Sequence, residues 1–305
     1  MLRQTVNKKR GLSLRQQQAL WAYAFLAVPL VFFAWIRIYP VFSAFNISVR
    51  KWDILSSETP FVGFKNYAKL LTDATFLKVV GNTLYYVVLC LPIGLALALA
   101  VAMMLNRIKH GVGFFRVLYF IPYVTSVVAV SWIWRWLFMK TGGLINNLLL
   151  SVGLPAQPFM SSTSQAIYVV ASNVVWQGLG FNVIIFLAGL KQIPTVYYEA
   201  ASMDGAKPWQ QFLHITMPLL NPTLVYLSVM TMIQTLQIFT QVKNISFQGT
   251  GGPLNATNSV VHYIYQTGFK SFNMGYASAM TVTLFLLILA ISLFQMKVLN
   301  KKVEY

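Results

Sequence analysis

Long runs of apolar residues, separated by short polar segments, dominate the chain. Six of these runs are long enough to cross a hydrocarbon layer of about 30 Å as α-helices of about 20 residues each. Backbone polar groups in lipid must pair within their own segment, so each run is expected to be helical. The pattern predicts an all-α integral membrane protein with six transmembrane helices, at 20–36, 83–104, 117–138, 166–190, 219–240 and 276–296.

No internal repeat or low-complexity segment divides the chain. We therefore expect a single transmembrane domain at 20–305, preceded by a basic N-terminal tail at 1–19. The first apolar run has no small-residue cleavage site directly after it, which favours a retained helix over a signal peptide.

One segment, at 191–218, is patterned like a helix but is too polar and too interrupted to span. Pro194 is a helix-start signal, and Gly205 belongs to a turn pair at which the helix is expected to stop. Pro208 suits the first turn of a second helix, which Pro218 is expected to end. The pattern predicts a short helix, a sharp turn and another short helix between the fourth and fifth spans.

Composition supports a membrane protein, because 57% of the residues are hydrophobic and only 10% are charged. The formal net charge of +17 would suggest nucleic acid in a soluble protein. Here the basic residues flank apolar spans, where membrane lipid and topology explain them, and no nucleic-acid partner is expected. The single cysteine, Cys90, lies in an apolar run and indicates neither a disulfide nor a metal site.

Basic residues also predict the orientation, since they concentrate in cytoplasmic segments. The N-terminal tail, the segments after the second and fourth spans and the C-terminus carry most of them. We expect both termini and segment 191–218 in the cytoplasm of a cell membrane protein. The basic residues on this side are Arg3, Lys8, Lys9, Arg10, Arg15, Arg107, Lys109, Arg116, Lys191, Lys207, Lys297, Lys301 and Lys302, against Arg50, Lys51, Lys65, Lys69, Lys140, Lys243 and Lys270 outside.

The chain has no visible source of energy or catalysis. It contains no G-x-x-x-x-G-K-[ST] phosphate loop, and none of its six acidic residues falls inside a predicted span. The second absence argues against an ion-coupled secondary carrier, which often has such residues there. His110, His214 and His262 are scattered without metal-ligand spacing. We expect no catalytic residue, metal or cofactor in this chain.

Two strips of polar residues lie within the later spans. Amides in hydrocarbon are costly unless they are paired or face a wet cavity. The strips are therefore candidates for a path that binds a solute with hydroxyl groups, and the alternative is hydrogen bonding between helices. They consist of Gln234, Gln237 and Gln241, at i, i+3 and i+7 on one face of the fifth span, and of Asn173, Trp176, Gln177 and Gly180 on the fourth.

Segment 191–218 resembles the EAA loop, E-A-A-x-x-D-G-A…I…x-P-L, of the membrane subunits of binding-protein-dependent ABC importers. Met217 stands where leucine is common in that loop, which is a conservative departure. The matching residues are Glu199, Ala200, Ala201, Asp204, Gly205, Ala206, Ile215, Pro218 and Leu219. Further similarity to the maltose, multiple-sugar and glycerol-phosphate permease group is carried by GLKQIPTVYYEAA, LYFIPYVTSVVAVSWIWRWLF, FVGFKNYAKLL and GTGGPLNATNSVVHYIYQTGF.

The resemblance implies a permease subunit that forms half of a translocation pore for a sugar or oligosaccharide. Implied partners are a second, homologous permease, two ATPase subunits that bind MgATP, and an extracytoplasmic solute-binding protein. The outer loops at 50–71 and 247–273 are candidate landing surfaces for that binding protein. The residues implied to couple to the ATPase are Glu199, Ala200, Ala201, Asp204, Gly205 and Ala206.

Two alternatives remain open at this stage. The same machine would import glycerol 3-phosphate, or the chain would be an ion-coupled secondary carrier. Only Arg37 and Arg135 lie in or next to spans, both near the outer ends, and this scarcity favours a neutral solute.

Overall fold

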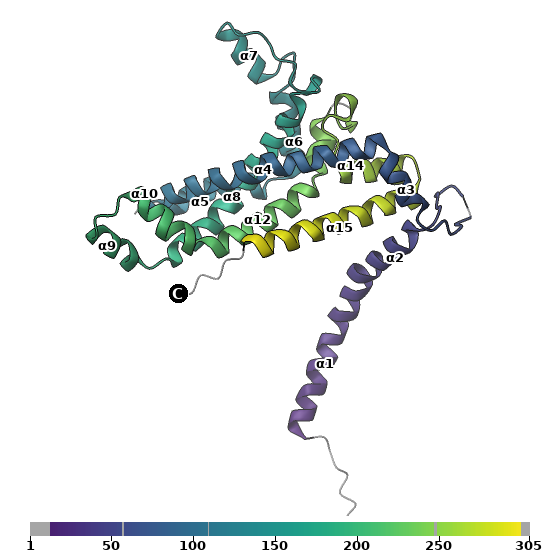
Figure 1. The fold of residues 1–305 in the computed structure, drawn as a ribbon, viewed down its shortest axis with the longest axis horizontal. Coiled ribbons are helices and arrows are strands. Elements are labelled where there is room, and N and C mark those ends of the chain that lie inside the picture. Colours follow the sequence, from purple (N-terminus) through teal and green to yellow (C-terminus); the bar gives the residue numbers. More distant parts are fainter. Residues whose placement is uncertain (1–12, 57, 109, 247–248, 300–305) are drawn as a thin grey trace, which may run out of the picture.

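The protein is an elongated helical bundle in a computed structural model that describes residues 13–56, 58–108, 110–246 and 249–299. The long helices α4 (Ala74–Arg107), α8 (Ala166–Gln192), α12 (Asn221–Leu236) and α15 (Met274–Leu299) lie side by side (Figure 1). Within these ranges there is no β-strand, only isolated bridges, which agrees with the all-α prediction. Residues 1–12 of the predicted tail lie outside the described part, as do seven of the basic residues used for orientation, namely Arg3, Lys8, Lys9, Arg10, Lys109, Lys301 and Lys302.

Four of the described helices are long and apolar enough to cross a membrane. They are Leu14–Ser48, Ala74–Arg107, Ala166–Gln192 and Met274–Leu299. Two further helix pairs reach the required length only together, because each is bent, by 90° between α5 and α6 and by 67° before α12. The predicted total of six is reached only if each bent pair is one span.

The first helix is longer than the predicted span 20–36. It begins at Leu14, where Ser13 caps it, and runs as α1 (Leu14–Phe33), one π-helical turn (Ala34–Ile38) and α2 (Tyr39–Ser48). The π turn comes directly before Pro40, whose nitrogen has no hydrogen to donate, and such a turn lets a helix continue past it. Residues 14–19 of the predicted tail are therefore helical.

The third predicted span, 117–138, is wrong as a single helix. It is divided into α5 (Val112–Val124) and α6 (Val127–Leu137). Thr125 and Ser126 between them have extended backbone angles, and the Thr125 hydroxyl donates to the carbonyl of Ile121 at 2.7 Å. Apolar composition continues through the break, so hydropathy alone does not reveal it.

The fifth predicted span, 219–240, is also interrupted. Helix α12 ends at Leu236, Phe239 is non-helical (φ −136°, ψ −59°), and α13 (Thr240–Ile245) follows. The Ser259 hydroxyl donates to the carbonyl of Ile238 at 2.6 Å and so replaces one lost helical bond. The prediction that Gln234, Gln237 and Gln241 lie on one face of a single helix is therefore wrong.

The ends of the bundle are built from short elements. At one end lie α9 (Thr195–Met203) and α10 (Pro208–Gln211), and at the other lie α3 (Lys65–Thr72) and α14 (Val260–Tyr265) (Figure 1). Within the described part of the outer loop at 50–71, α3 is the helical segment. The remaining short pieces are α7 (Leu144–Ser151), α11 (Met217–Leu219), π turns at Phe212–Thr216 and Gln266–Lys270, and 3₁₀ turns at Phe159–Ser161 and Pro253–Asn255.

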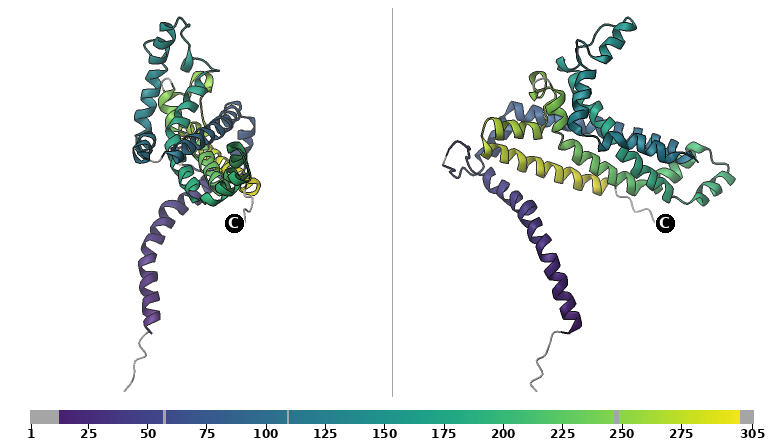
Figure 2. Two further views of the ribbon diagram at one scale, coloured as in Figure 1. Left: turned by 90° about the vertical axis from the view of Figure 1, so that its left-hand side faces the viewer. Right: turned by 180° about the vertical axis from the view of Figure 1, so that it is seen from behind.

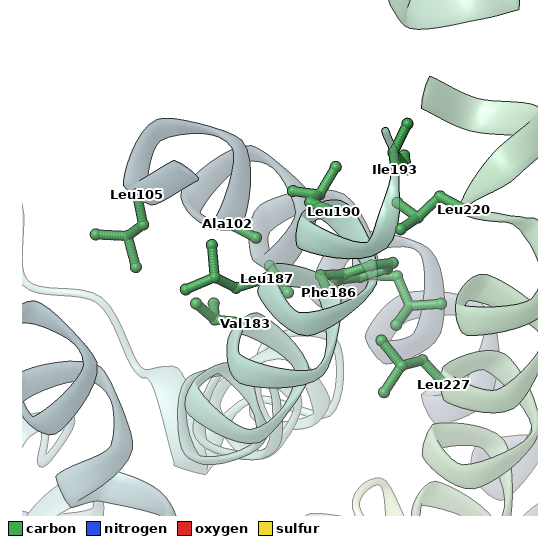
Figure 3. Close-up of a cluster of buried hydrophobic side chains, with 11 residues drawn as sticks. Ala102, Leu105, Val183, Phe186, Leu187, Leu190, Ile193, Leu220 and Leu227 are labelled. Carbon is green, nitrogen blue, oxygen red and sulfur yellow. The ribbon is translucent and has the colours of Figure 1, made fainter. Parts of the chain in front are cut away.

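A cluster of leucine-rich side chains holds α4, α8 and α12 together near the α9–α10 end. Leu187 and Leu190 on α8 pack between Ala102 on α4 and Leu220 before α12 (Figure 3). Ile193, the residue after α8, is also buried in this cluster. The start of segment 191–218 is thereby fixed to the bundle.

Two parts of the chain project from the bundle in every view (Figures 1 and 2). Helix α1 leaves at an angle, and none of its residues is buried, although Phe45 of α2 contacts Phe285 of α15 edge to face at 6.2 Å. Helices α6 and α7 extend to the opposite side of the bundle. Both projections expose large apolar side chains, including Trp35 and Trp132.

Candidate functional site

A cavity of about 290 Å³ lies where the two broken helices meet inside the bundle. Tyr123 and Val127 reach it from the two sides of the α5–α6 break, and Phe239 reaches it from the α12–α13 break. Irregular backbone within a membrane is tolerated where it lines a cavity, and discontinuous helices commonly form solute sites. The lining is Cys90, Gly94, Tyr123, Val127, Val174, Val175, Gln177, Gly178, Asn182, Thr231, Gln234, Thr235, Gln237, Ile238, Phe239, Thr240 and Gln241.

The cavity wall is polar but uncharged. It contains four glutamines, one asparagine and three threonines, and no Asp, Glu, Lys, Arg or His. The Gln241 side-chain amide donates to that of Gln177 at 3.5 Å, while the Gln177 Nε2 atom is buried without a partner of its own to donate to. Amides both donate and accept, so this wall suits a ligand with several hydroxyl groups.

The polar strips of the sequence are divided by the structure. Gln177, Gln234, Gln237 and Gln241 all line the cavity. The glutamines near α12 meet there because the broken helix ends turn toward the cavity, and not because they share one helix face.

Asn173, Trp176 and Gly180 of the fourth-span strip lie elsewhere. Asn173 is 0% exposed and does not line the cavity, and neither polar atom of its side chain has a partner. The ring of Trp176 packs 4.8 Å from that of Trp134 at the surface. A Cβ on Gly180 would come 2.0 Å from the Tyr119 carbonyl oxygen, so Gly180 permits the close contact of α8 with α5.

Sequence reasoning missed several polar cavity residues. Asn182 on α8 and Thr231, Thr235 and Thr240 around α12 line the wall. Thr231 precedes Gln234 by three positions, so the helical period already placed it on the same face as that residue. Thr240 had no such signal, because its position depends on the break.

The second candidate region is the loop at 191–218. Helix α9 ends at Met203, and Gly205 has a left-handed conformation (φ +78°). The Gly205 amide donates to the Ser202 carbonyl at 3.1 Å and the Ala206 amide to the Ala201 carbonyl at 2.9 Å. This is a glycine C-cap, which closes α9 and turns the chain. The predicted start near Thr195 and turn at Gly205 are confirmed.

The second helix ends one residue beyond the predicted end at Pro218. Helical structure continues from Pro208 through a π turn to Leu219. The wider turn at Phe212–Thr216 precedes Pro218 and accommodates its missing N–H. The loop is therefore joined directly to the helix that leads into the cavity.

Hydrogen bonds make the loop one compact unit. The Gln211 amide donates to Ser202 Oγ at 2.9 Å, and the hydroxyls of Tyr198 and Thr216 are 2.9 Å apart. These bonds tie α9 to the segment that follows the turn. A pocket of about 300 Å³ lies between the two arms and is lined in part by Asp204.

The outer surface of the loop carries both polar and large apolar side chains. Met203 is 85% exposed, and Val196, Trp209 and Leu213 are exposed as well. Of the six residues implied for coupling, Glu199, Ala200, Asp204 and Gly205 are exposed, and Ala201 and Ala206 are half-buried. Exposed apolar residues gathered on one short element are typical of a protein-binding surface.

Comparison with known proteins identifies the family. Residues 9–305 match the family described as "Binding-protein-dependent transport system inner membrane component". The chain is 33% identical over 300 residues to the probable ABC transporter permease protein YesP of Bacillus subtilis, covering 97% of this chain and 96% of the relative. It is 30% identical over 281 residues to the sn-glycerol-3-phosphate transport system permease protein UgpA of Agrobacterium fabrum, covering 92% and 93%. It is also 30% identical over 287 residues to the lactose transport system permease protein LacF of Rhizobium radiobacter, covering 93% and 95%.

A solved structure has the same fold. The crystal structure of a bacterial ABC transporter involved in the import of the acidic polysaccharide alginate matches with a TM-score of 0.82 at 23% identity, covering 94% of this chain and 98% of that one. The chain is thus a multi-pass membrane protein, and it belongs to the binding-protein-dependent transport system inner membrane component family, whose relatives named here are ABC transporter permeases.

Proposed function

We propose that this chain forms half of the solute pathway of an ATP-driven importer and that the solute is a neutral sugar or oligosaccharide. The observation that supports this solute class best is the uncharged, amide-rich wall of the cavity between the broken helices. A volume of about 290 Å³ is at the lower end of typical small-molecule pockets and suits about one sugar unit at a time.

Glycerol 3-phosphate is the second candidate, because a relative with 30% identity carries that name. A phosphate group is commonly bound by arginine, lysine or a set of backbone N–H groups. None of the residues lining the cavity has a cationic side chain. The cavity therefore favours the neutral solute.

The loop at 191–218 is proposed to transmit the movement of an ATPase subunit to the cavity. Glu199, Ala200, Asp204 and Gly205 lie on its exposed side, where a partner would contact them. Ile193 and Leu220 at the two ends of the loop are buried in the same cluster. A displacement of the loop would therefore move α8 and α12 together.

These two helices also supply the polar wall of the cavity. Gln177 belongs to α8 and Gln234 to α12, so a change in the angle between the helices would separate or join the two amides. Alternating access would follow from this change, with a binding protein delivering solute at one end and the ATPase acting at the other.

A second permease subunit is proposed to complete the pathway. Helix α1 makes no buried contact within the chain, and α6 and α7 project from the other side. Apolar surfaces of this extent suit both lipid and a second transmembrane subunit. Two ATPase subunits carrying MgATP and an extracytoplasmic binding protein would complete the assembly.

The orientation with both termini and α9 in the cytoplasm can be tested with a reactive cysteine. The single natural cysteine, Cys90, is only 2% exposed. A Met203→Cys variant should react with a membrane-impermeant maleimide only in inside-out vesicles from which the ATPase subunits have been stripped. Labelling in intact cells would reverse the proposed orientation.

The proposed function is tested by purifying the complex from native membranes and reconstituting it in proteoliposomes. We expect an ATPase and a second permease in stoichiometric amounts, and ATP-dependent uptake of a neutral oligosaccharide in preference to glycerol 3-phosphate. Preferential uptake of glycerol 3-phosphate would show that the solute is not a neutral sugar. Uptake without any ATPase would support an ion-coupled carrier.

A further inference from the structure

A polar pocket lies at the end of the bundle opposite α9 and α10. Its volume is about 530 Å³, and its walls come from the first outer loop, from α3 and the start of α4, and from the chain between α14 and α15. The residues that carry the argument are Asp53, Lys69, Asp73, Tyr263, Lys270 and Tyr276. The solute cavity and the α9–α10 loop share none of them.

The Asp73 carboxylate is fully occupied by bonds within the chain. Its Oδ2 atom accepts from the hydroxyls of Tyr276 at 2.7 Å and Tyr263 at 3.1 Å, and Oδ1 accepts from the amides of Thr75 and Phe76. Burial alone would raise the pKa of Asp73, but these four bonds outweigh it and lower that pKa below the ordinary value. Asp73 thus fixes the pocket wall as a charged structural group.

The two lysines have a different environment. Both Lys69 and Lys270 are exposed, and the Lys69 ammonium lies 4.6 Å from the centre of the Tyr276 ring. Asp53 Oδ1 accepts a hydrogen bond from the Leu55 amide at 3.0 Å. Both oxygens of Asp73 and one oxygen of Asp53 thus already accept hydrogen bonds from other donors, and both lysine side chains are exposed.

The surroundings add the net positive charge that the pocket itself lacks, because its two lysines are balanced by Asp53 and Asp73. The outer segments nearest this end carry seven basic residues and three acidic ones, which are Arg50, Lys51, Lys65, Lys69, Lys78, Lys243 and Lys270 against Asp53, Glu58 and Asp73. Topology does not call for basic residues on an outer face, where they are usually depleted. A positive field on a surface steers an acidic partner toward it.

The rim of the pocket is also held rigidly. The Gly275 amide donates to the Trp52 carbonyl at 3.0 Å, and the Ile54 amide donates to the Phe272 carbonyl at 3.1 Å. A Cβ on Gly275 would come 2.2 Å from the Arg50 carbonyl oxygen, so the first outer loop and α15 touch through their backbones. A rigid surface loses little conformational entropy when a partner binds.

We propose that Lys69 and Lys270 form a socket for acidic side chains on the surface of the solute-binding protein, where the first and last outer loops meet. This rests on the proposed function, which places this end of the bundle outside the cytoplasm. The charge selects an acidic protein surface, and the rigid rim orients it over the bundle.

A zero-length carbodiimide tests the contact directly, because it joins an ammonium to a carboxylate only when the two groups touch. The reagent is applied to intact spheroplasts supplied with their extracytoplasmic fraction, and cross-linked peptides are identified by mass spectrometry. We expect Lys69 or Lys270 joined to Asp or Glu of a solute-binding protein. Links from these lysines only to membrane subunits would overturn the proposal.

Charge reversal tests its energetic weight in the reconstituted complex. The Lys69→Glu/Lys270→Glu variant should raise the binding-protein concentration that half-saturates ATPase activity about tenfold or more at low salt, and it should weaken the dependence on salt. Lys140→Glu is the control, because Lys140 is exposed but lies on the turn between α6 and α7. ATPase activity without binding protein should be unchanged, which shows that the variant is assembled.

The outcomes separate the inference from the proposed function. If the wild-type complex contains no ATPase or does not respond to a binding protein, the proposed function fails. If wild type responds and the double variant matches Lys140→Glu in half-saturation and salt dependence, the socket alone is wrong. A defect confined to one anionic solute would assign the lysines to solute capture and would also overturn the proposal.

Discussion

Two helix interruptions in this protein differ in what surrounds them. At Gly205 the chain breaks in the open, and the helices on either side expose apolar residues such as Met203 and Trp209. At Phe239 the chain breaks inside the bundle, and the break lies beside a cavity whose wall contains glutamine and threonine side chains. The same local event therefore produces a surface for a protein in one place and a site for a small solute in the other.

The largest effect is expected from Gly205→Val, which tests whether the loop works as a shaped element. A β-branched residue in the left-handed conformation costs about 1–2 kcal/mol, so the turn would open. Uptake should fall about a hundredfold or more, because a displacement of about 1 Å in a precisely positioned element can reduce a rate by that factor. The measurement is ATP-dependent uptake at equal amounts of the variant and wild type in the membrane.

Gly153→Val is the matched control. Gly153 follows α7 with φ +79°, against +78° for Gly205, and a Cβ at either position meets nothing within 4 Å. The Leu154 amide donates to the Leu149 carbonyl at 2.9 Å, so Gly153 belongs to the same type of C-cap and valine would strain it in the same way. Uptake should be nearly normal in this control. Equal loss in both variants would show that general strain, and not the loop, is responsible.

The next effect concerns the apolar surface beside Gly205. Met203→Glu should reduce recovery of the ATPase with this chain about 10- to 100-fold, because burying a methionine contributes about 1.5–3 kcal/mol. Leu55→Glu is a suitable control, since Leu55 is 79% exposed on the outer loop. Undiminished ATPase recovery with Met203→Glu would leave the apolar surface without its proposed partner.

The cavity side of the comparison is tested on one helix. Gln177→Leu should raise the solute concentration for half-maximal uptake about tenfold, through loss of a hydrogen bond of about 1.4 kcal/mol. Asn173→Leu, four positions earlier on α8 and away from the cavity, should leave that concentration unchanged. Gln237→Leu should behave like Gln177→Leu. If all three variants have the same solute concentration for half-maximal uptake as wild type, the glutamines serve only as contacts between helices.

The smallest effect is expected at Asp73, which contributes to stability and not to transport. Its pKa is lowered in the folded protein, so its stabilisation is complete above the ordinary value of 3.8 and is lost as pH falls through the folded value. Asp73→Asn should flatten the decline in thermal stability below about pH 4. Thermal unfolding between pH 3 and 7 measures this, and an unchanged acid decline would exclude the contribution.

The apolar runs predicted the long helices well because burial in lipid requires only composition and length. The fourth span, 166–190, agrees with α8 to within two residues at its end. The break at Phe239 could not be predicted in the same way, because it involves a distant partner, Ser259, which bonds to the Ile238 carbonyl. The break at Ser126 interrupts a run that stays apolar, so hydropathy gives no sign of it. The turn at Gly205 could be predicted, since a glycine and its neighbours are enough to make a C-cap.

The candidate cavity was predictable only in part for the same reason. A periodic strip assumes an unbroken helix, and it therefore missed Thr240, which follows the α12–α13 break. On the unbroken α8 the strip grouped Asn173 with Gln177, although only Gln177 lines the cavity. Polar residues in the span identified the right helices. Their assignment to the cavity wall required the path of the backbone.

The 35-residue helix from Leu14 to Ser48 has a consequence for biogenesis. At 1.5 Å per residue it is about 52 Å long, well beyond the hydrocarbon thickness of about 30 Å, so it must tilt or extend into water. Its α1 part has no buried residue, so the described bundle leaves it uncovered. If the second permease covers it, a copy of this chain without that partner would expose the helix until assembly. Cellular proteases would then recognise the exposed helix and degrade surplus subunits.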